Sequence, residues 1–142
     1  MSSSEPLADP RIQAFLATKH VVVLAMLGPD GAPIATPMWF LHAPDELFMI
    51  SVDGLPKVHN LRRDPRVSVV AEITTPEGAI RGVTVRGRVE FLTESAERRG
   101  LTGRFLEKYH PRLERLWGGR VMPPNRVMFR IAPQHVRSWG LE

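Results

Sequence analysis

The chain has 142 residues, enough to enclose one hydrophobic core without disulfides or metals, and we expect a single domain over residues 1–142. Because it contains no cysteine, a disulfide framework, a thiolate metal site and a cysteine nucleophile are excluded. Its net charge of +4 comes mainly from arginines that are interspersed with acidic residues and accompany no nucleic-acid-binding motif, so we expect no nucleic-acid partner.

The apolar segments are all short. The longest run, Val21 to Leu27, is far too short to cross a membrane. The first residues, MSSSEPLADP, lack the charged-then-apolar order of a signal peptide. We therefore expect no membrane association and a cytoplasmic location.

The N-terminal part is predicted to form a short helix over Pro10–Thr18 and a hairpin. The turn signal Gly28-Pro29-Asp30-Gly31 joins the strand Val21–Leu27 to the strand Pro33–Leu41. The second strand is apolar on both sides of its alternation, which predicts that both of its faces are covered. Because Pro37 cannot donate to a ladder, this strand should lie at a sheet edge, carry a bulge, or leave its backbone to a ligand.

The segment after the strand Glu46–Ser51 predicts one or two turns of helix that begin at Pro56 and end before Pro65. Lys57 then lies in the first turn, where the helix dipole disfavours a cation, and Asn60 follows one turn later on the same face. Free N–H groups, an ammonium and an amide at one helix end form a candidate phosphate site. The alternative is a lysine that extends into solvent.

The remaining segments predict mostly strands. In Val83–Phe91, valines alternate with polar residues, and the interruption at Gly87 predicts a bulge or a close backbone approach. The other predictions are a strand over Arg66–Ile73, a helix over Glu94–Tyr109 capped by Thr93 or Ser95, a loop over Pro111–Asn125, and strands over Val127–Ile131 and Val136–Trp139. Six or seven antiparallel strands with few helices predict a mainly β fold, an antiparallel barrel.

Motifs of catalysis are missing from the sequence. It contains no dinucleotide-binding glycine fingerprint, Walker loop, H-E-x-x-H or G-x-S-x-G. The five histidines never fall at ligand spacing, so we expect no metal site, and no side chain is assigned a catalytic role. Such a chain can still be an enzyme if a bound cofactor carries the reaction.

Four segments carry a resemblance to a known family: residues 21–40 (VVVLAMLGPDGAPIATPMWF), 56–70 (PKVHNLRRDPRVSVV), 81–91 (RGVTVRGRVEF) and 130–140 (RIAPQHVRSWG). Together they resemble the flavin-binding split-barrel superfamily related to pyridoxamine 5′-phosphate oxidase, and most of all its branch that uses the deazaflavin coenzyme F-420. The resemblance implies a Greek-key-like split barrel that forms a homodimer, with the cofactor in a groove between two chains.

The resemblance also implies the residues that bind the cofactor. Backbone next to the ring would come from Thr36, Pro37 and Met38, and the ribityl chain would follow Ser51 and Val52. Lys57 and Asn60 would hold the phosphate. Arg81, Gly82 and Val83 would come from the second half of the site. Trp39 is interpreted as a packed aromatic side chain rather than a ring-stacking one.

The implied function is hydride transfer between coenzyme F-420 and a small unsaturated or conjugated organic acceptor. F-420 carries a phosphodiester and a polyglutamate tail, and Arg62, Arg63 and Arg66 could supply the additional cations that this tail needs. A solvated surface is the equally weighted interpretation of these arginines. The alternatives are an FMN-dependent oxidase or reductase, and a non-catalytic carrier of flavin, haem or another tetrapyrrole.

Overall fold

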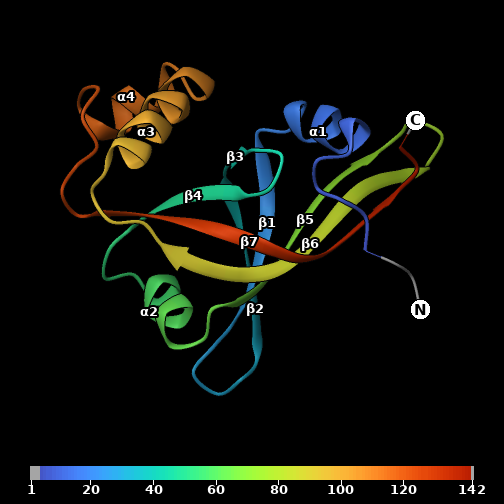
Figure 1. Ribbon diagram of the computed structural model, residues 1–142, viewed down its shortest axis with the longest axis horizontal. Helices are drawn as coiled ribbons and strands as arrows, with labels where there is room; N and C mark the ends of the chain where they lie inside the picture. The colour runs from blue at the N-terminus through green and yellow to red at the C-terminus, as the bar shows by residue number, and fades with distance from the viewer. Residues whose placement is uncertain (1–3, 142) are drawn as a thin grey trace.

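Seven antiparallel strands form one strongly curled sheet in the computed structural model, which describes residues 4–141 (Figure 1). The strand order is β2-β1-β5-β6-β7-β4-β3. The strands are β1 (Val21–Leu27), β2 (Pro33–Trp39), β3 (Leu41–His42), β4 (Leu47–Val52), β5 (Arg66–Thr74), β6 (Ile80–Phe91) and β7 (Arg126–Trp139). The helices are α1 (Pro10–Ala17), α2 (Pro56–Arg63), α3 (Ala96–Lys108) and α4 (Arg112–Trp117). The chain is therefore mainly β with a split-barrel fold, as predicted.

The concave side of the sheet encloses the larger of two hydrophobic cores. Alternate residues of the strands point into it, among them Leu24, Met49, Val85 and Ile131. Helix α1 contributes Ile12 to the same core, where its side chain is fully buried. In the residues that the structure describes, no helix is long and apolar enough to span a membrane.

A second core lies on the opposite face of β4 and β7, where α3 and α4 pack (Figure 1). Phe48 and Met128 supply the sheet side of this core, and Phe105 and Leu113 supply the helix side. Because β4 has a core on each face, four of its six residues are buried, and only Ile50 and Val52 are partly accessible.

Helix α4 corrects the sequence analysis, which predicted a loop over Pro111–Asn125. The helix forms because Leu113 is buried in the second core, while Gly118, with φ of 73°, ends the helix in the left-handed conformation. The predicted final two strands are one strand, β7, which continues past Pro133 next to the irregularity in its pairing with β6. That irregularity falls between Arg86 and Gly87, which confirms the predicted bulge.

Strand β2 confirms one prediction and contradicts another. It lies at the sheet edge, which is one of the three outcomes that Pro37 predicted. It ends at Trp39 rather than Leu41, because the backbone N–H of Phe40 donates to the hydroxyl of Tyr109 (2.8 Å) instead of to a strand. Ile34 remains 42% exposed in the single chain, so the covering of both faces stays a prediction that depends on a second copy.

Candidate functional site

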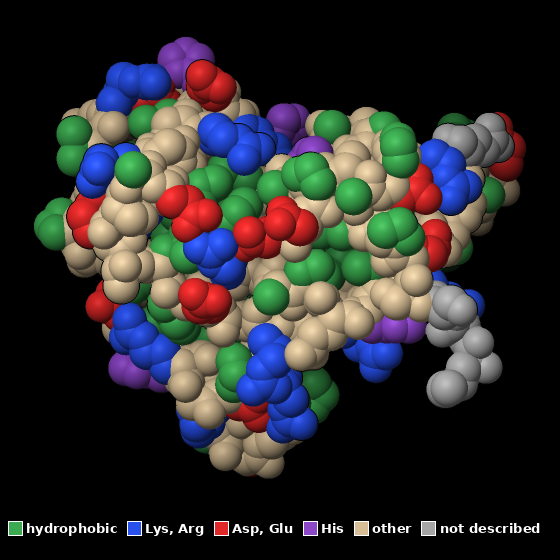
Figure 2. All heavy atoms as spheres, in the orientation of Figure 1, with side chains coloured by type: hydrophobic (Ala, Val, Ile, Leu, Met, Phe, Trp, Pro, Cys, Tyr) green, Lys and Arg blue, Asp and Glu red, His purple; other side chains and the backbone are tan. Residues whose placement is uncertain are grey.

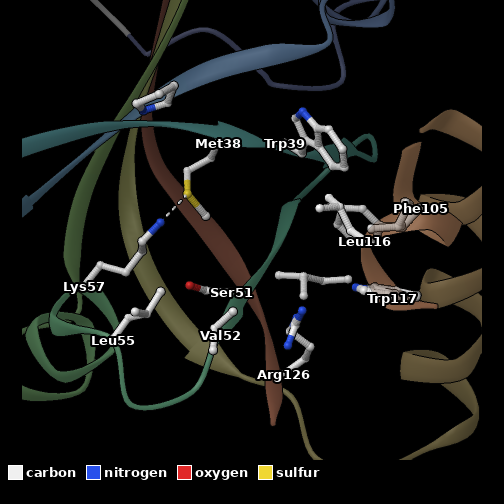
Figure 3. A pocket seen from close by; sticks show the side chains of 13 residues that line it. Met38, Trp39, Ser51, Val52, Leu55, Lys57, Phe105, Leu116, Trp117 and Arg126 are labelled. Atoms are coloured by element: carbon white, nitrogen blue, oxygen red, sulfur yellow. Dashed lines mark hydrogen bonds between the residues drawn. The ribbon is translucent and has the colours of Figure 1, made fainter. Parts of the chain in front are cut away.

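A pocket of about 390 Å³ lies between the β2 edge, the start of α2 and the α3–α4 pair (Figure 3). The sheet supplies Pro37, Met38, Trp39, Ile50, Ser51, Val52 and Arg126. The helices and the turn before α2 supply Leu55, Lys57, Phe105, Leu113, Leu116 and Trp117. The pocket thus lies where the two hydrophobic cores meet.

Lys57 reaches the pocket because α2 begins where the sequence predicted. Pro56 is the first helical residue, Leu55 precedes it without a side-chain cap, and the helix ends at Arg63. The half-buried ammonium lies 3.5 Å from the sulfur of Met38 (Figure 3). Within residues 4–141 no carboxylate lies within ion-pair distance of it. An ammonium held this way favours an anionic ligand.

Arg126 brings a second cation to the pocket. Its position is set by the pairing of β4 with β7, in which Arg126 stands opposite Val52. Its guanidinium donates to the amide oxygen of Asn125 at 2.6 Å, and no carboxylate pairs with it among the described residues. Since no Asp or Glu lines the pocket, its electrostatic character is positive.

Ser51 presents an unused polar group. Its residue is only 7% exposed, and its hydroxyl oxygen is buried without a hydrogen-bond partner. Figure 3 shows this oxygen pointing to the side of the pocket where Lys57 lies. Buried hydroxyls are nearly always hydrogen-bonded in native proteins, so a ligand with a polar chain is a natural partner. The orphaned hydroxyl and the two cations fit a cofactor that carries a hydroxylated chain and a phosphate.

The aromatic part of the pocket is held by Tyr109. The ring of Trp39 stacks on the Tyr109 ring with 4.4 Å between centroids and 8° between planes, so Trp39 packs against α3 while it also lines the pocket. The single proton of the Tyr109 hydroxyl has two carbonyl acceptors within reach, those of His20 (2.7 Å) and Phe40 (3.0 Å). Burial raises the pKa of Tyr109 to about 12, so the hydroxyl keeps its proton at neutral pH.

Of the ten site residues expected from the resemblance, the structure brings five together around the pocket: Pro37, Met38, Ser51, Val52 and Lys57. Thr36 and Asn60 do not line it, and the Asn60 side chain is buried and accepts a hydrogen bond from Arg63 at 2.9 Å. The other three residues, Arg81, Gly82 and Val83, lie at the start of β6, and Val83 points into the larger core. Their role opposite a second chain stays a prediction.

The arginines that follow Lys57 do not reach the pocket in this chain. Arg62 pairs with Asp53 (3.2 Å), Arg63 donates to the carbonyl of Leu27 (3.1 Å), and Arg66 pairs with Asp64 (2.7 Å). The Arg66 guanidinium lowers the pKa of the Asp64 carboxyl to about 2. Figure 2 shows that basic side chains gather on the surface around α2, and this surface is outside the pocket.

Sequence reasoning named neither Arg126 nor the individual residues of the helical wall. Trp117 and Leu116 fall in the segment predicted as a loop, where an aromatic residue before a Gly-Gly pair was the available signal. Arg126 enters the site only through strand register, which no local pattern reveals. Within the described residues there is no group of three or more side chains that could hold a metal ion.

Residues 8–140 match the family model of pyridoxamine 5′-phosphate oxidase, and the chain therefore belongs to this family. A conserved hypothetical protein from Mycobacterium tuberculosis is 29% identical, with a TM-score of 0.77 over 92% of this chain and 83% of that chain. No curated protein matches the chain.

Two further solved structures share the fold at lower identity. A FAD-binding protein from Mesorhizobium loti is 24% identical, with a TM-score of 0.71 over 88% of each chain. A haem storage protein from Vibrio cholerae is 18% identical, with a TM-score of 0.75 over 92% of this chain and 93% of that chain. At these identities the likeness extends to the fold alone.

Proposed function

We propose that the chain is an oxidoreductase that binds a flavin-type cofactor in the pocket around Lys57 and Ser51. The observation that carries this proposal is that two polar groups of the pocket lack partners among the described residues. The Lys57 ammonium has no carboxylate partner, and the buried Ser51 hydroxyl has no hydrogen-bond partner. Both lie on one wall of a pocket of about 390 Å³, which suits a ligand with an anionic group and a polar chain. Family membership supports the same type of cofactor.

The roles of the chain's own residues follow from the lining. Lys57 and Arg126 would hold the anionic part of the cofactor, and the Ser51 hydroxyl would bond its polar chain. A bound flavin-type ring supplies the hydride chemistry. The lining contains no Asp, Glu or His, so the protein would act by binding, orienting and excluding water rather than by proton transfer from a side chain.

Within this proposal, coenzyme F-420 is the preferred cofactor and FMN the alternative. The support for F-420 is the resemblance of residues 56–70 and the second cation of the pocket, Arg126. Titrating the apo protein with each cofactor by fluorescence or calorimetry tests the preference, and tighter binding of FMN would refute it. A haem absorption band that develops on adding haemin, without binding of either flavin-type cofactor, would assign the chain to the carriers instead.

A second copy of the chain is part of the same proposal. Strands β1 and β2 present apolar side chains outward, and Val21, Val23 and Ile34 are 42%, 37% and 42% exposed. A stable homodimer would cover such a surface with an interface above about 1,000 Å² in total. Light scattering at micromolar concentration should give the mass of two chains, and a monomer would contradict this part.

The decisive experiment for the site is the substitution Lys57→Ala, with Arg62→Ala as its control. Both variants remove one cation from α2, but only Lys57 lines the pocket, whereas Arg62 pairs with Asp53. Lys57→Ala removes a charge-assisted contact of about 1.5–3 kcal/mol, so its cofactor affinity should fall roughly ten- to hundredfold. The cofactor affinity of Arg62→Ala should stay nearly unchanged.

If Lys57 only extends into solvent, the substitution leaves cofactor affinity unchanged. The apo variant would then be equally stable or slightly more stable, because a cation is removed from the helix N-terminus. Cofactor affinity and apo melting temperature, measured on the same preparation, distinguish the two outcomes. Unchanged affinity would refute the proposed site.

A further inference from the structure

A second group of cations lies outside the pocket, where the end of α3 meets the segment that joins β2 to β3. It consists of His42, Arg104 and Lys108, and none of the three lines the pocket. Arg104 and Lys108 are four residues apart on α3, so they lie on the same face of the helix. We call these three residues the α3 cation cluster.

Two backbone carbonyls hold the α3 cations in place. The Lys108 ammonium donates to the carbonyl of Phe40 at 2.9 Å and lies 3.7 Å from the centre of the Phe40 ring. The Arg104 guanidinium donates to the carbonyl of His42 at 3.1 Å. Each of these hydrogen bonds occupies one N–H group, and the hydrogen bonds of residues 4–141 leave the other N–H groups of both side chains without an acceptor.

Gln13 fixes the protonation of the His42 ring. The Gln13 amide donates to the carbonyls of Leu7 (2.9 Å) and Ala43 (3.0 Å), so both of its N–H groups are used. Its oxygen lies 2.8 Å from Nδ1 of His42 and accepts a hydrogen bond from it, so Nδ1 carries the proton of the neutral ring. The other nitrogen, Nε2, therefore gains the proton when His42 becomes charged.

No carboxylate balances the charge of the cluster. None of the ion pairs in the described part of the chain includes a member of it, and Glu107 of α3 is exposed and pairs with neither helical cation. Burial, Lys108 and Arg104 lower the pKa of His42, while burial and Arg104 lower the pKa of Lys108 to about 8. Like charges four residues apart destabilise a helix, and an anion bound between them would remove this cost.

We propose that the α3 cation cluster is a second binding site, which takes a dianionic phosphate group. Lys108 and Arg104 supply N–H donors that backbone carbonyls already hold in place, and His42 adds a third donor when the bound anion draws a proton to Nε2. A phosphate group offers three strong acceptor oxygens, which matches donors from three side chains. The proposal does not depend on the proposed cofactor, because the cluster shares no residue with the pocket.

The test follows the imidazole resonance of His42 by NMR while inorganic phosphate is added at constant ionic strength, so that screening does not change. The resonance is assigned by its loss in His42→Gln. We expect saturable binding and a rise in the pKa of His42, because a bound dianion favours the charged imidazole. Phenyl phosphate is titrated in parallel: tighter binding than inorganic phosphate assigns the site to phosphate monoesters, and equal or weaker binding assigns it to free phosphate.

Three variants separate binding at the cluster from general charge effects. Lys108→Met and Arg104→Gln each remove one cation, and each should weaken phosphate binding about tenfold or more. Arg99→Gln is the matched control, because Arg99 lies on the same helix but pairs with Glu94 at 2.9 Å, and it should leave phosphate affinity unchanged. Arg104 is exposed, so Arg104→Gln tests the site even if Lys108→Met does not fold.

Lys57→Ala distinguishes this site from the cofactor pocket. Phosphate bound at the cluster should still shift the His42 resonance in Lys57→Ala, and loss of this response would refute the site. A His42 resonance that does not respond to millimolar phosphate, or an equal loss of affinity in Arg99→Gln, also overturns the proposal. If Lys57→Ala leaves cofactor affinity unchanged while the cluster binds phosphate, the proposed function fails and this site stands.

Discussion

Replacing Ser51 by alanine should make the apo protein more stable and its cofactor binding weaker. The Ser51 hydroxyl is buried and unpaired in the described chain, so in the absence of ligand it contributes desolvation cost without a hydrogen bond. Alanine keeps the strand residue and its Cβ while removing only the oxygen. The substitution therefore separates the demands of folding from those of binding.

The magnitudes follow from the environment of this one oxygen. A buried polar group without a partner costs about 1–3 kcal/mol. Removing the Ser51 oxygen also removes its van der Waals contacts, which offsets part of this gain. We therefore expect the free energy of unfolding to rise by about 1 kcal/mol. A hydrogen bond to the cofactor contributes about 0.5–1.5 kcal/mol, so cofactor affinity should fall roughly two- to tenfold.

Urea unfolding of the apo variants, together with cofactor titration, measures both effects. Ser138→Ala is the matched control, because the Ser138 hydroxyl donates to Glu5 at 2.6 Å and its loss should destabilise the protein by about 1 kcal/mol. The same chemical change should thus shift the unfolding midpoint in opposite directions at the two serines. A destabilised Ser51→Ala, or one that binds cofactor normally, would refute this account of the pocket.

Two further predictions concern the last turn of α3. Tyr109→Phe removes the acceptor of the fully buried Phe40 N–H and should lower the free energy of unfolding by about 1–3 kcal/mol, whereas Thr102→Ala on the same helix should change it by less than about 0.5 kcal/mol. Burial lowers the pKa of Lys108 from 10.5 to about 8, so between pH 8 and 9.5 the unfolded chain binds more protons than the folded one and stability should rise with pH. Urea midpoints across this range should show the rise in the unmodified protein and not in Lys108→Met.

Local signals in the sequence predicted the structural features that depend on residues close together in the sequence. The limits of β1, the start of α2 at Pro56, the Ser95 cap of α3 and the bulge at Gly87 all follow from turn, capping and alternation patterns. Gly87 is a clear example, because a Cβ there would lie 2.2 Å from the carbonyl oxygen of Ala132.

Features that depend on distant contacts could not be predicted. Strand β2 ends early because Tyr109, 69 residues away, takes the Phe40 N–H. Helix α4 exists because Leu113 finds a buried position on β4 and β7, and Arg126 reaches the pocket through the β4–β7 register. The sequence therefore predicted the Lys57 side of the pocket, but not that a helix, α4, forms part of the opposite side.

The two hydrophobic cores have a consequence for how the protein opens. Since α3 and α4 share a core that is distinct from the barrel interior, they form a unit that can detach from β4 and β7 while the barrel stays folded. Such partial unfolding needs less free energy than global unfolding, and it removes one wall of the pocket. We therefore expect a bound ligand to slow amide hydrogen exchange in α3 and α4 more than in the barrel strands.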